Sequence, residues 1–283
     1  GIEMKKKHGA ENVFDFSLGN PDLPPPPTVA NALRDIADSL DRPLALGYMP
    51  NAGYPDVRAA LARKLATEQH TTLSGDHVVL TCGAAGAINA LLRAVTTPGD
   101  EILCPAPYFV EYGFYADNAG CSLVTAPSAP LTFTLDLKAL EAAITPATRA
   151  VIVNSPNNPA GVIYSESELR ELAAILTRRS ETYGHPIFLV SDEPYRFLTY
   201  DNAQVPPILP LYPYSVVIGS FSKNLSLAGE RVGYLVANPA MPSVQRRLAG
   251  IIMTNRILGF VNAPAIGQRV MAAALDSAVD VTV

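Results

Sequence analysis

The chain has 283 residues, of which 48% are hydrophobic and 17% charged, and its formal net charge is −5. This composition supports a large buried core and excludes an intrinsically disordered chain. Acidic and basic residues are interspersed without a basic stripe, so nucleic acid is not an expected partner. The sequence contains no run of about 18 apolar residues, so we expect no membrane partner either.

The cysteines, the histidines and the two ends of the sequence give further expectations. Cys82, Cys104 and Cys121 are odd in number and widely spaced, which favours a reduced, cytoplasmic location over a disulfide framework. The histidines show no metal-ligand spacing, so we expect no metal site. The sequence begins with Gly1 rather than Met and stops just after a helical pattern, and we therefore expect a fragment of a longer protein.

Before residue 77 the sequence predicts one short strand and two helices. Residues 13–18 alternate as a strand, and Pro24–Pro27 forms a rigid connection. A helix opened by Pro55 runs to about Glu68, because proline is well tolerated in a first helical turn. Residues 29–40 predict the other helix, which has one apolar face made of Val29, Leu33, Ile36 and Leu40.

From residue 77 onward, strand-like and helix-like patterns alternate. The predicted strands are His77–Thr81, Glu101–Cys104, Ser122–Thr125, Ala150–Asn154, Ile187–Ser191, Ser215–Gly219 and Val232–Ala237. The predicted helices between them are Ala84–Val95, Val110–Ala119, Leu137–Ile144 and Glu166–Tyr183. Wholly apolar strands suit a sheet that is covered on both faces, and the alternation implies crossover connections. We therefore expect an α/β fold of three layers, α/β/α, around a mainly parallel seven-stranded sheet.

Ligands collect at the carboxyl ends of strands in such sheets, and a lysine follows one of these ends. Lys223 lies just after the strand Ser215–Gly219, where an unpaired ammonium is costly to desolvate. Ser220, Ser222 and Arg231 together offer two hydroxyl donors and a forked cation, a set that could hold a phosphate. The alternative is an exposed lysine in an ordinary turn.

Two other strand ends carry groups that could hold a pyridoxal ring. Asp192 ends an apolar strand, where a carboxylate could keep a pyridinium nitrogen protonated, or it could merely cap a turn. Tyr195 and Asn158 could both bind the phenolic oxygen of the same ring, although the Asn-Pro-x-Gly sequence at Asn158 also forms a turn by itself.

The segment Thr81–Gly86 marks a tight passage from a strand into a helix. The first amides of that helix, at Ala84 and Ala85, are free and lie at the positive end of the helix dipole, which suits a phosphate. A strand-to-helix turn without any ligand is an equally good interpretation of this segment alone.

Together these segments resemble the class I and II aminotransferases of fold type I, close to the aspartate aminotransferase superfamily. The matching segments follow the family's order along the chain and are Ser17–Asp22, Tyr48–Gly53, Pro105–Phe109, Asn157–Gly161, Asp192–Tyr195 and Ser220–Lys223 with Arg231–Gly233. Each motif alone has weak or moderate specificity, and their common order gives the resemblance its strength.

The resemblance implies a pyridoxal 5'-phosphate cofactor and a role for each site residue. Lys223 would bind the cofactor as a Schiff base and move protons, while Asp192 would pair with the ring nitrogen. Asn158 and Tyr195 would bind the phenolic oxygen. The phosphate would be held by the amides of Ala84 and Ala85 and by Ser220, Ser222 and Arg231.

The resemblance also implies contacts around the ring and the substrate. Phe109 would stack on the ring, in place of the Trp or Tyr of many members. Gly19 and Asn158 would lie near the substrate carboxylate, and Tyr48 would reach the phosphate of the neighbouring subunit in a homodimer. Ala84 and Ala85 replace side-chain donors of many relatives, so backbone amides must contribute more at this phosphate site.

The implied function is an aminotransferase that moves an amino group from an amino acid to a 2-oxo acid by a ping-pong Schiff-base mechanism. Residues 1–45 would begin a small domain and 46–283 would form the large cofactor-binding domain, with the substrate-carboxylate arginine beyond residue 283. Arg256 is more consistent with a surface or interface role. Two alternatives remain open, a C–S β-lyase on the same fold and the ligand-sensing domain of a winged-helix transcription regulator.

Overall fold

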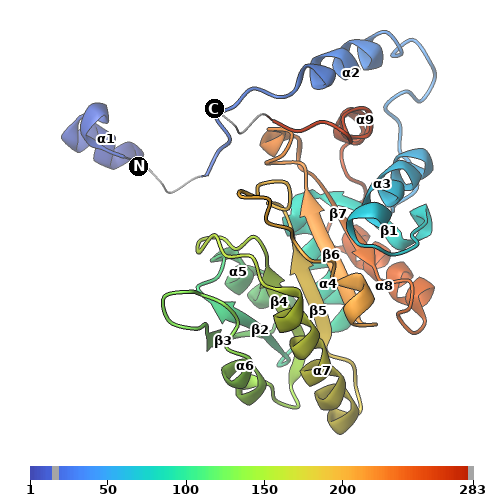
Figure 1. The fold of residues 1–283 in the computed structure, drawn as a ribbon. Helices are drawn as coiled ribbons and strands as arrows, with labels where there is room; N and C mark the ends of the chain where they lie inside the picture. The colour runs from blue at the N-terminus through green and yellow to red at the C-terminus, as the bar shows by residue number, and fades with distance from the viewer. Residues whose placement is uncertain (15–18, 280–283) are drawn as a thin grey trace.

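A seven-stranded sheet organises the computed structural model, which describes residues 1–14 and 19–279 (Figure 1). The strands are β1 (Val78–Cys82), β2 (Glu101–Ala106), β3 (Ser122–Pro127), β4 (Thr148–Asn154), β5 (Phe188–Asp192), β6 (Ser215–Ser220) and β7 (Val232–Ala237). Their order across the sheet is β1-β7-β6-β5-β4-β2-β3. Only β7 runs antiparallel to its neighbours, so the prediction of a mainly parallel sheet is confirmed.

Helices cover both faces of the sheet, as the apolar strands predicted. The helices are α1 (Ile2–His8), α2 (Pro27–Ala37), α3 (Pro55–Glu68), α4 (Gly83–Val95), α5 (Glu111–Ala119), α6 (Leu137–Ala143), α7 (Glu166–Tyr183), α8 (Val244–Ile257) and α9 (Ala265–Ala273). Of these, α1 buries no residue and α2 packs on α9 rather than on the sheet. None of the helices in the described part of the chain is long and apolar enough to cross a membrane.

Alternate residues of the central strands supply two separate cores. In β4, Val151 and Val153 pack with α3, α6, α7 and α9, whereas Ala150 and Ile152 pack with α4, α5 and α8 on the opposite face. This alternation follows from the two-residue period of a strand, and both sets are apolar because both faces are covered. The result is the three-layer α/β/α arrangement that the sequence predicted (Figure 1).

Local sequence signals explain where several helices begin and end. α7 starts at a capping box in which Ser165 accepts from the Glu168 amide and the Glu168 side chain accepts from the Ser165 amide. It stops before Gly184, which has a left-handed φ of 71°. α3 opens with Pro55 and ends at Glu68, as predicted.

The first 45 residues differ most from the sequence-based expectation. The predicted helix 29–40 is α2, which ends three residues earlier, at Ala37. Within the predicted apolar face Val29 is buried and Ile36 packs against the core, but Leu33 is 46% exposed because α2 buries Ala32 instead. Leu40, which is 51% exposed, lies beyond the end of α2. Val13 and Phe14 lie in no strand, and the rest of the predicted strand falls outside the described residues. The helical pattern near the end of the sequence is α9, whereas α8 was not predicted.

Candidate active site

The carboxyl ends of three neighbouring strands lie side by side in the sheet. Asn154 at the end of β4 pairs with Asp192 at the end of β5, and Asp192 pairs with Ile218 of β6. A cavity of about 440 Å³ opens beside these ends. It is lined by every site residue that the sequence predicted except Tyr48, namely Gly19, Ala84, Ala85, Phe109, Asn158, Asp192, Tyr195, Ser220, Ser222, Lys223 and Arg231.

Asp192 is a buried carboxylate with one unpartnered oxygen. Its Oδ2 accepts a hydrogen bond of 2.7 Å from the Tyr112 hydroxyl, while its Oδ1 has no partner among the described residues. Burial raises the pKa of Asp192 to about 7, and the Tyr112 hydrogen bond opposes that rise. Because a buried acceptor without a partner is costly, Oδ1 is well suited to a ligand that brings an N–H donor.

Tyr112 is a site residue that the sequence analysis missed. It lies in the first turn of α5, is only 1% exposed and joins Asp192 across 80 positions of sequence. Burial and the neighbouring Asp192 raise the pKa of Tyr112 well above its ordinary value, so its hydroxyl remains a donor. Its position three residues after Phe109 was the available signal, but the contact itself depends on how α5 packs on the sheet.

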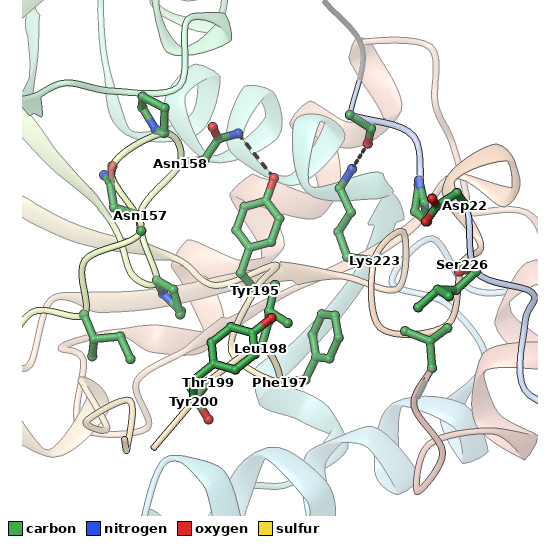
Figure 2. A pocket seen from close by; sticks show the side chains of 18 of the residues that line it. Asp22, Asn157, Asn158, Tyr195, Phe197, Leu198, Thr199, Tyr200, Lys223 and Ser226 are labelled. Atoms are coloured by element: carbon green, nitrogen blue, oxygen red, sulfur yellow. Dashed lines mark hydrogen bonds between the residues drawn. The ribbon is translucent and has the colours of Figure 1, made fainter. Parts of the chain in front are cut away.

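Lys223 follows β6 and extends its amine to the edge of the cavity. Nζ donates a hydrogen bond to the carbonyl oxygen of Gly19 (Figure 2). Burial lowers the pKa of Lys223. A lysine with a lowered pKa has a larger neutral fraction near pH 7, and the neutral amine is the nucleophile that attacks carbonyl groups.

Tyr195 and Asn158 both line the cavity, and the Asn158 Nδ2 donates a hydrogen bond of 3.3 Å to the Tyr195 hydroxyl (Figure 2). The turn predicted at Asn158 supports this geometry, since the Asn158 amide donates to Asn154 Oδ1 over 2.6 Å and Gly161 adopts a φ of 71°. Burial raises the pKa of Tyr195, whereas the Asn158 hydrogen bond acts to lower it.

Two glycines bring the start of α4 close to the guanidinium of Arg231. A Cβ on Gly233 would lie 2.3 Å from the carbonyl carbon of Gly83, and a Cβ on Gly83 would lie 2.8 Å from Arg231 Nη2. Gly83 also has a φ of 68°, a region that side chains rarely adopt. Within residues 1–14 and 19–279, no side chain caps the first amides of α4. Free amides beside a forked cation form an anion site of the kind that phosphate favours.

A second cavity, of about 770 Å³, meets the first at Lys223. Gly19, Asn158, Tyr195 and Lys223 line both cavities. The larger one is further lined by residues that the sequence analysis did not single out, among them Phe197, Leu198, Thr199 and Tyr200 (Figure 2). The Lys223 amine therefore lies where the two cavities join.

Tyr48 and Arg256 lie away from both cavities. Tyr48 is 94% exposed, so any contact with a cofactor requires another subunit, as its predicted role does. Arg256 lies in the last turn of α8 and lines neither cavity.

The family model of aminotransferase class I and II matches residues 11–282. The chain therefore belongs to this family, and the resemblance seen in the sequence is confirmed. Among curated relatives, a probable aspartate/prephenate aminotransferase of Thermus aquaticus is 34% identical over 237 residues, which are 82% of this chain and 58% of the relative. A probable N-acetyl-LL-diaminopimelate aminotransferase of Bacillus subtilis is 32% identical and shares 80% of this chain and 56% of its own length.

The solved structures agree with the family assignment. An amino transferase from Eubacterium rectale superposes with a TM-score of 0.94 at 37% identity, over 99% of this chain and 71% of that one. Aspartate aminotransferase from Thermotoga maritima gives a TM-score of 0.84 at 27% identity, over 99% and 70% of the two chains. The chain spans a little over half the length of the curated relatives it matches.

Members of the aspartate aminotransferase family use pyridoxal 5'-phosphate, and the residues of the smaller cavity fit this group. The unpartnered Oδ1 of Asp192 suits a protonated ring nitrogen, and the start of α4 beside Arg231 suits a phosphate. Lys223 supplies an amine between them. These three features are the ones that the cofactor's ring, phosphate and aldehyde each require.

The hydrogen bond from Tyr112 gives a prediction about Asp192. In Tyr112→Phe the carboxylate loses a donor, so the pKa of Asp192 should rise further and its charge should weaken. Because a hydrogen bond to a charged group contributes about 1.5–3 kcal/mol, we expect turnover to fall roughly tenfold to a hundredfold. Steady-state kinetics checks this against Tyr183→Phe, which loses a 3.3 Å hydrogen bond to Ile144 on the far side of the sheet. Equal kinetics in the two variants would remove Tyr112 from the site.

Proposed function

We propose that the protein is a pyridoxal-phosphate-dependent aminotransferase that moves an amino group from an amino acid to a 2-oxo acid by a ping-pong route. The observation that carries this proposal is a buried carboxylate with a free oxygen, Asp192, facing the same cavity as the desolvated amine of Lys223. When bound, the cofactor supplies an electrophilic aldehyde and an electron-withdrawing ring.

Lys223 is the residue to which we assign covalent attachment and proton transfer. Its lowered pKa leaves more of Nζ neutral at neutral pH, and only the neutral amine can attack a carbonyl or accept a proton. The Gly19 carbonyl holds Nζ at the junction of the two cavities, where an amino acid can reach it. We assign the substrate carboxylate to the neighbourhood of Gly19 and Asn158.

Asp192, Tyr195 and Asn158 set the charges around the ring. An ionised Asp192 favours a proton on a ring nitrogen placed at Oδ1, which strengthens the ring as an electron acceptor. Since the pKa of Tyr195 is raised, its phenol stays protonated and donates to a phenolic oxygen together with the Asn158 amide. Phe109 and Ile88 line the same cavity and exclude water from part of it.

We also propose the division into residues 1–45, the start of a small domain, and 46–283, the large cofactor-binding domain. Burial supports it for α1, in which no residue is buried, whereas α2 buries Val29 and Ala32 in the core of the large domain. A cytoplasmic location is supported by three free cysteines, two of which are fully buried.

A homodimer is proposed from apolar side chains that are exposed in or beside α5 and α8. Both helices contact α4, whose first turn belongs to the proposed phosphate site. The exposed side chains are Val110, Phe114, Met253, Ile257 and Phe260. Phe260 lies beside the start of α4, since its ring would be 3.8 Å from a Cβ on Gly86. An exposed apolar surface next to the phosphate site is suited to a second copy that contributes Tyr48.

Borohydride reduction tests the proposed chemistry directly. In the full-length protein with pyridoxal phosphate, we expect a stable adduct on the Lys223 peptide by mass spectrometry, and none in Lys223→Ala. Lys138→Ala, an exposed lysine of α6, should keep the adduct. An adduct on another lysine of the wild type would contradict the assignment. An amino acid should then yield its 2-oxo acid, whereas pyruvate released from cystathionine would point to the lyase.

The dimer prediction concerns assembly and cofactor affinity separately. Light scattering of the full-length protein should give a dimer. Tyr48→Phe should keep the dimer but weaken cofactor binding about tenfold, because one hydrogen bond to a charged phosphate is lost. A monomer that binds the cofactor as tightly as the relatives do, or a Tyr48→Phe dimer with unchanged affinity, would show that Tyr48 does not cross to a partner.

A further inference from the structure

The first turns of α5 bring a carboxylate and a second tyrosine into the cofactor cavity. Glu111 and Tyr115 line this cavity together with Ala84, Ala85 and Arg231. The Tyr115 hydroxyl donates to Glu111 Oε2, one helical turn back along α5. Tyr115 is 7% exposed, and among the described residues its hydroxyl makes a side-chain hydrogen bond to Glu111 alone.

At the phosphate end of the cavity the start of α4 contributes backbone amides, while Ser220, Ser222 and Arg231 contribute side-chain donors. Ala84 and Ala85 offer amides but no side-chain donor. Among the described residues, the charged side chains that line the cavity are Lys223, Arg231, Asp192 and Glu111, two of each sign. A phosphate ester carries about −1.5 to −2 charge near pH 7, so a further donor that turns toward it would strengthen its binding in a cavity balanced in this way.

We propose that Tyr115 is a further cofactor-binding residue, whose hydroxyl turns from Glu111 to the phosphate of the bound cofactor in place of the donors missing at Ala84 and Ala85. Glu111 competes with the phosphate for this hydroxyl, and its negative charge repels the phosphate. Glu111 therefore limits the affinity for the cofactor. The inference rests on the cofactor named in the proposed function, but it assigns two residues outside the set that the sequence predicted.

The chemistry of the pair permits this exchange. A phenolic proton rotates about the C–O bond, so the donor can change acceptor without moving the ring. Burial and the hydrogen bond to Glu111 raise the pKa of Tyr115, so the hydroxyl keeps its proton, although the nearby Arg231 acts in the opposite direction.

Binding of three probes to the full-length protein tests the inference. The probes are pyridoxal phosphate, pyridoxal, which lacks the phosphate, and inorganic phosphate. Tyr115→Phe should weaken binding of pyridoxal phosphate about tenfold or more and leave pyridoxal unchanged. Glu111→Gln should tighten pyridoxal phosphate roughly threefold to tenfold, because a repelling charge is removed. Inorganic phosphate should follow pyridoxal phosphate in both variants.

Matched controls separate this effect from general damage. Tyr183→Phe and Glu166→Gln remove a hydroxyl and a charge on α7, where Glu166 pairs with Arg170, and should leave all three affinities unchanged. Equal weakening of pyridoxal and pyridoxal phosphate by Tyr115→Phe, or weaker phosphate binding in Glu111→Gln, would overturn the inference. The inference would also be overturned if Tyr115→Phe and Glu111→Gln bound pyridoxal phosphate with the affinity of the wild type. A wild type that binds no cofactor would instead refute the proposed function.

Discussion

A single carboxylate, Asp192, imposes the strongest constraint on this structure. It ends the central strand β5, it is 4% exposed, and one of its oxygens lacks a partner among the described residues. A buried charge of this kind destabilises a protein unless something in the folded state compensates it. The Tyr112 hydroxyl donates a hydrogen bond to Oδ2, and the unpartnered Oδ1 favours a ligand that brings an N–H donor. The site therefore begins with a local destabilisation that a protonated ring nitrogen would relieve.

The other end of the cavity depends on backbone rather than on side chains. Gly83 and Gly233 allow α4 and β7 to approach so closely that a single added Cβ would collide with the main chain. This approach brings free helix amides next to Arg231, which itself adopts a left-handed φ of 52°. The sheet fixes the distance between the two ends, because β5, β6 and β7 are neighbours in the hydrogen-bonded order. Lys223, in the turn after β6, falls between the carboxylate and the anion site.

Residues that follow strands could be predicted from the sequence, including Ala84 and Ala85 where β1 passes into α4, but residues that reach the site from α5 could not. Asp192, Lys223 and Asn158 come directly after or at the ends of apolar strands, and a parallel sheet brings such ends together whatever the helices do. Tyr112, Glu111 and Tyr115 enter from α5, and which side of a helix faces a cavity depends on its rotation against the sheet. The exposure of Leu33 has the same origin, since the rotation of α2 buries Val29 and Ala32 and leaves Leu33 outside. α8 was missed because polar residues and Gly250 interrupt its apolar pattern.

The most direct test of the central claim counts protons when the cofactor binds. Without ligand, Asp192 with a pKa of about 7 holds a proton below that pH and loses it above. If Asp192 is the partner of the ring nitrogen, that nitrogen keeps its proton in the complex both below and above pH 7, and Asp192 is ionised. In Asp192→Asn the ring nitrogen has no anionic partner and stays unprotonated. Calorimetry in buffers of different ionisation enthalpy should therefore show equal proton uptake by wild type and Asp192→Asn about one unit below pH 7. About one unit above pH 7, the wild type should take up nearly one proton more. The same uptake by both proteins at both pH values would contradict the role given to Asp192.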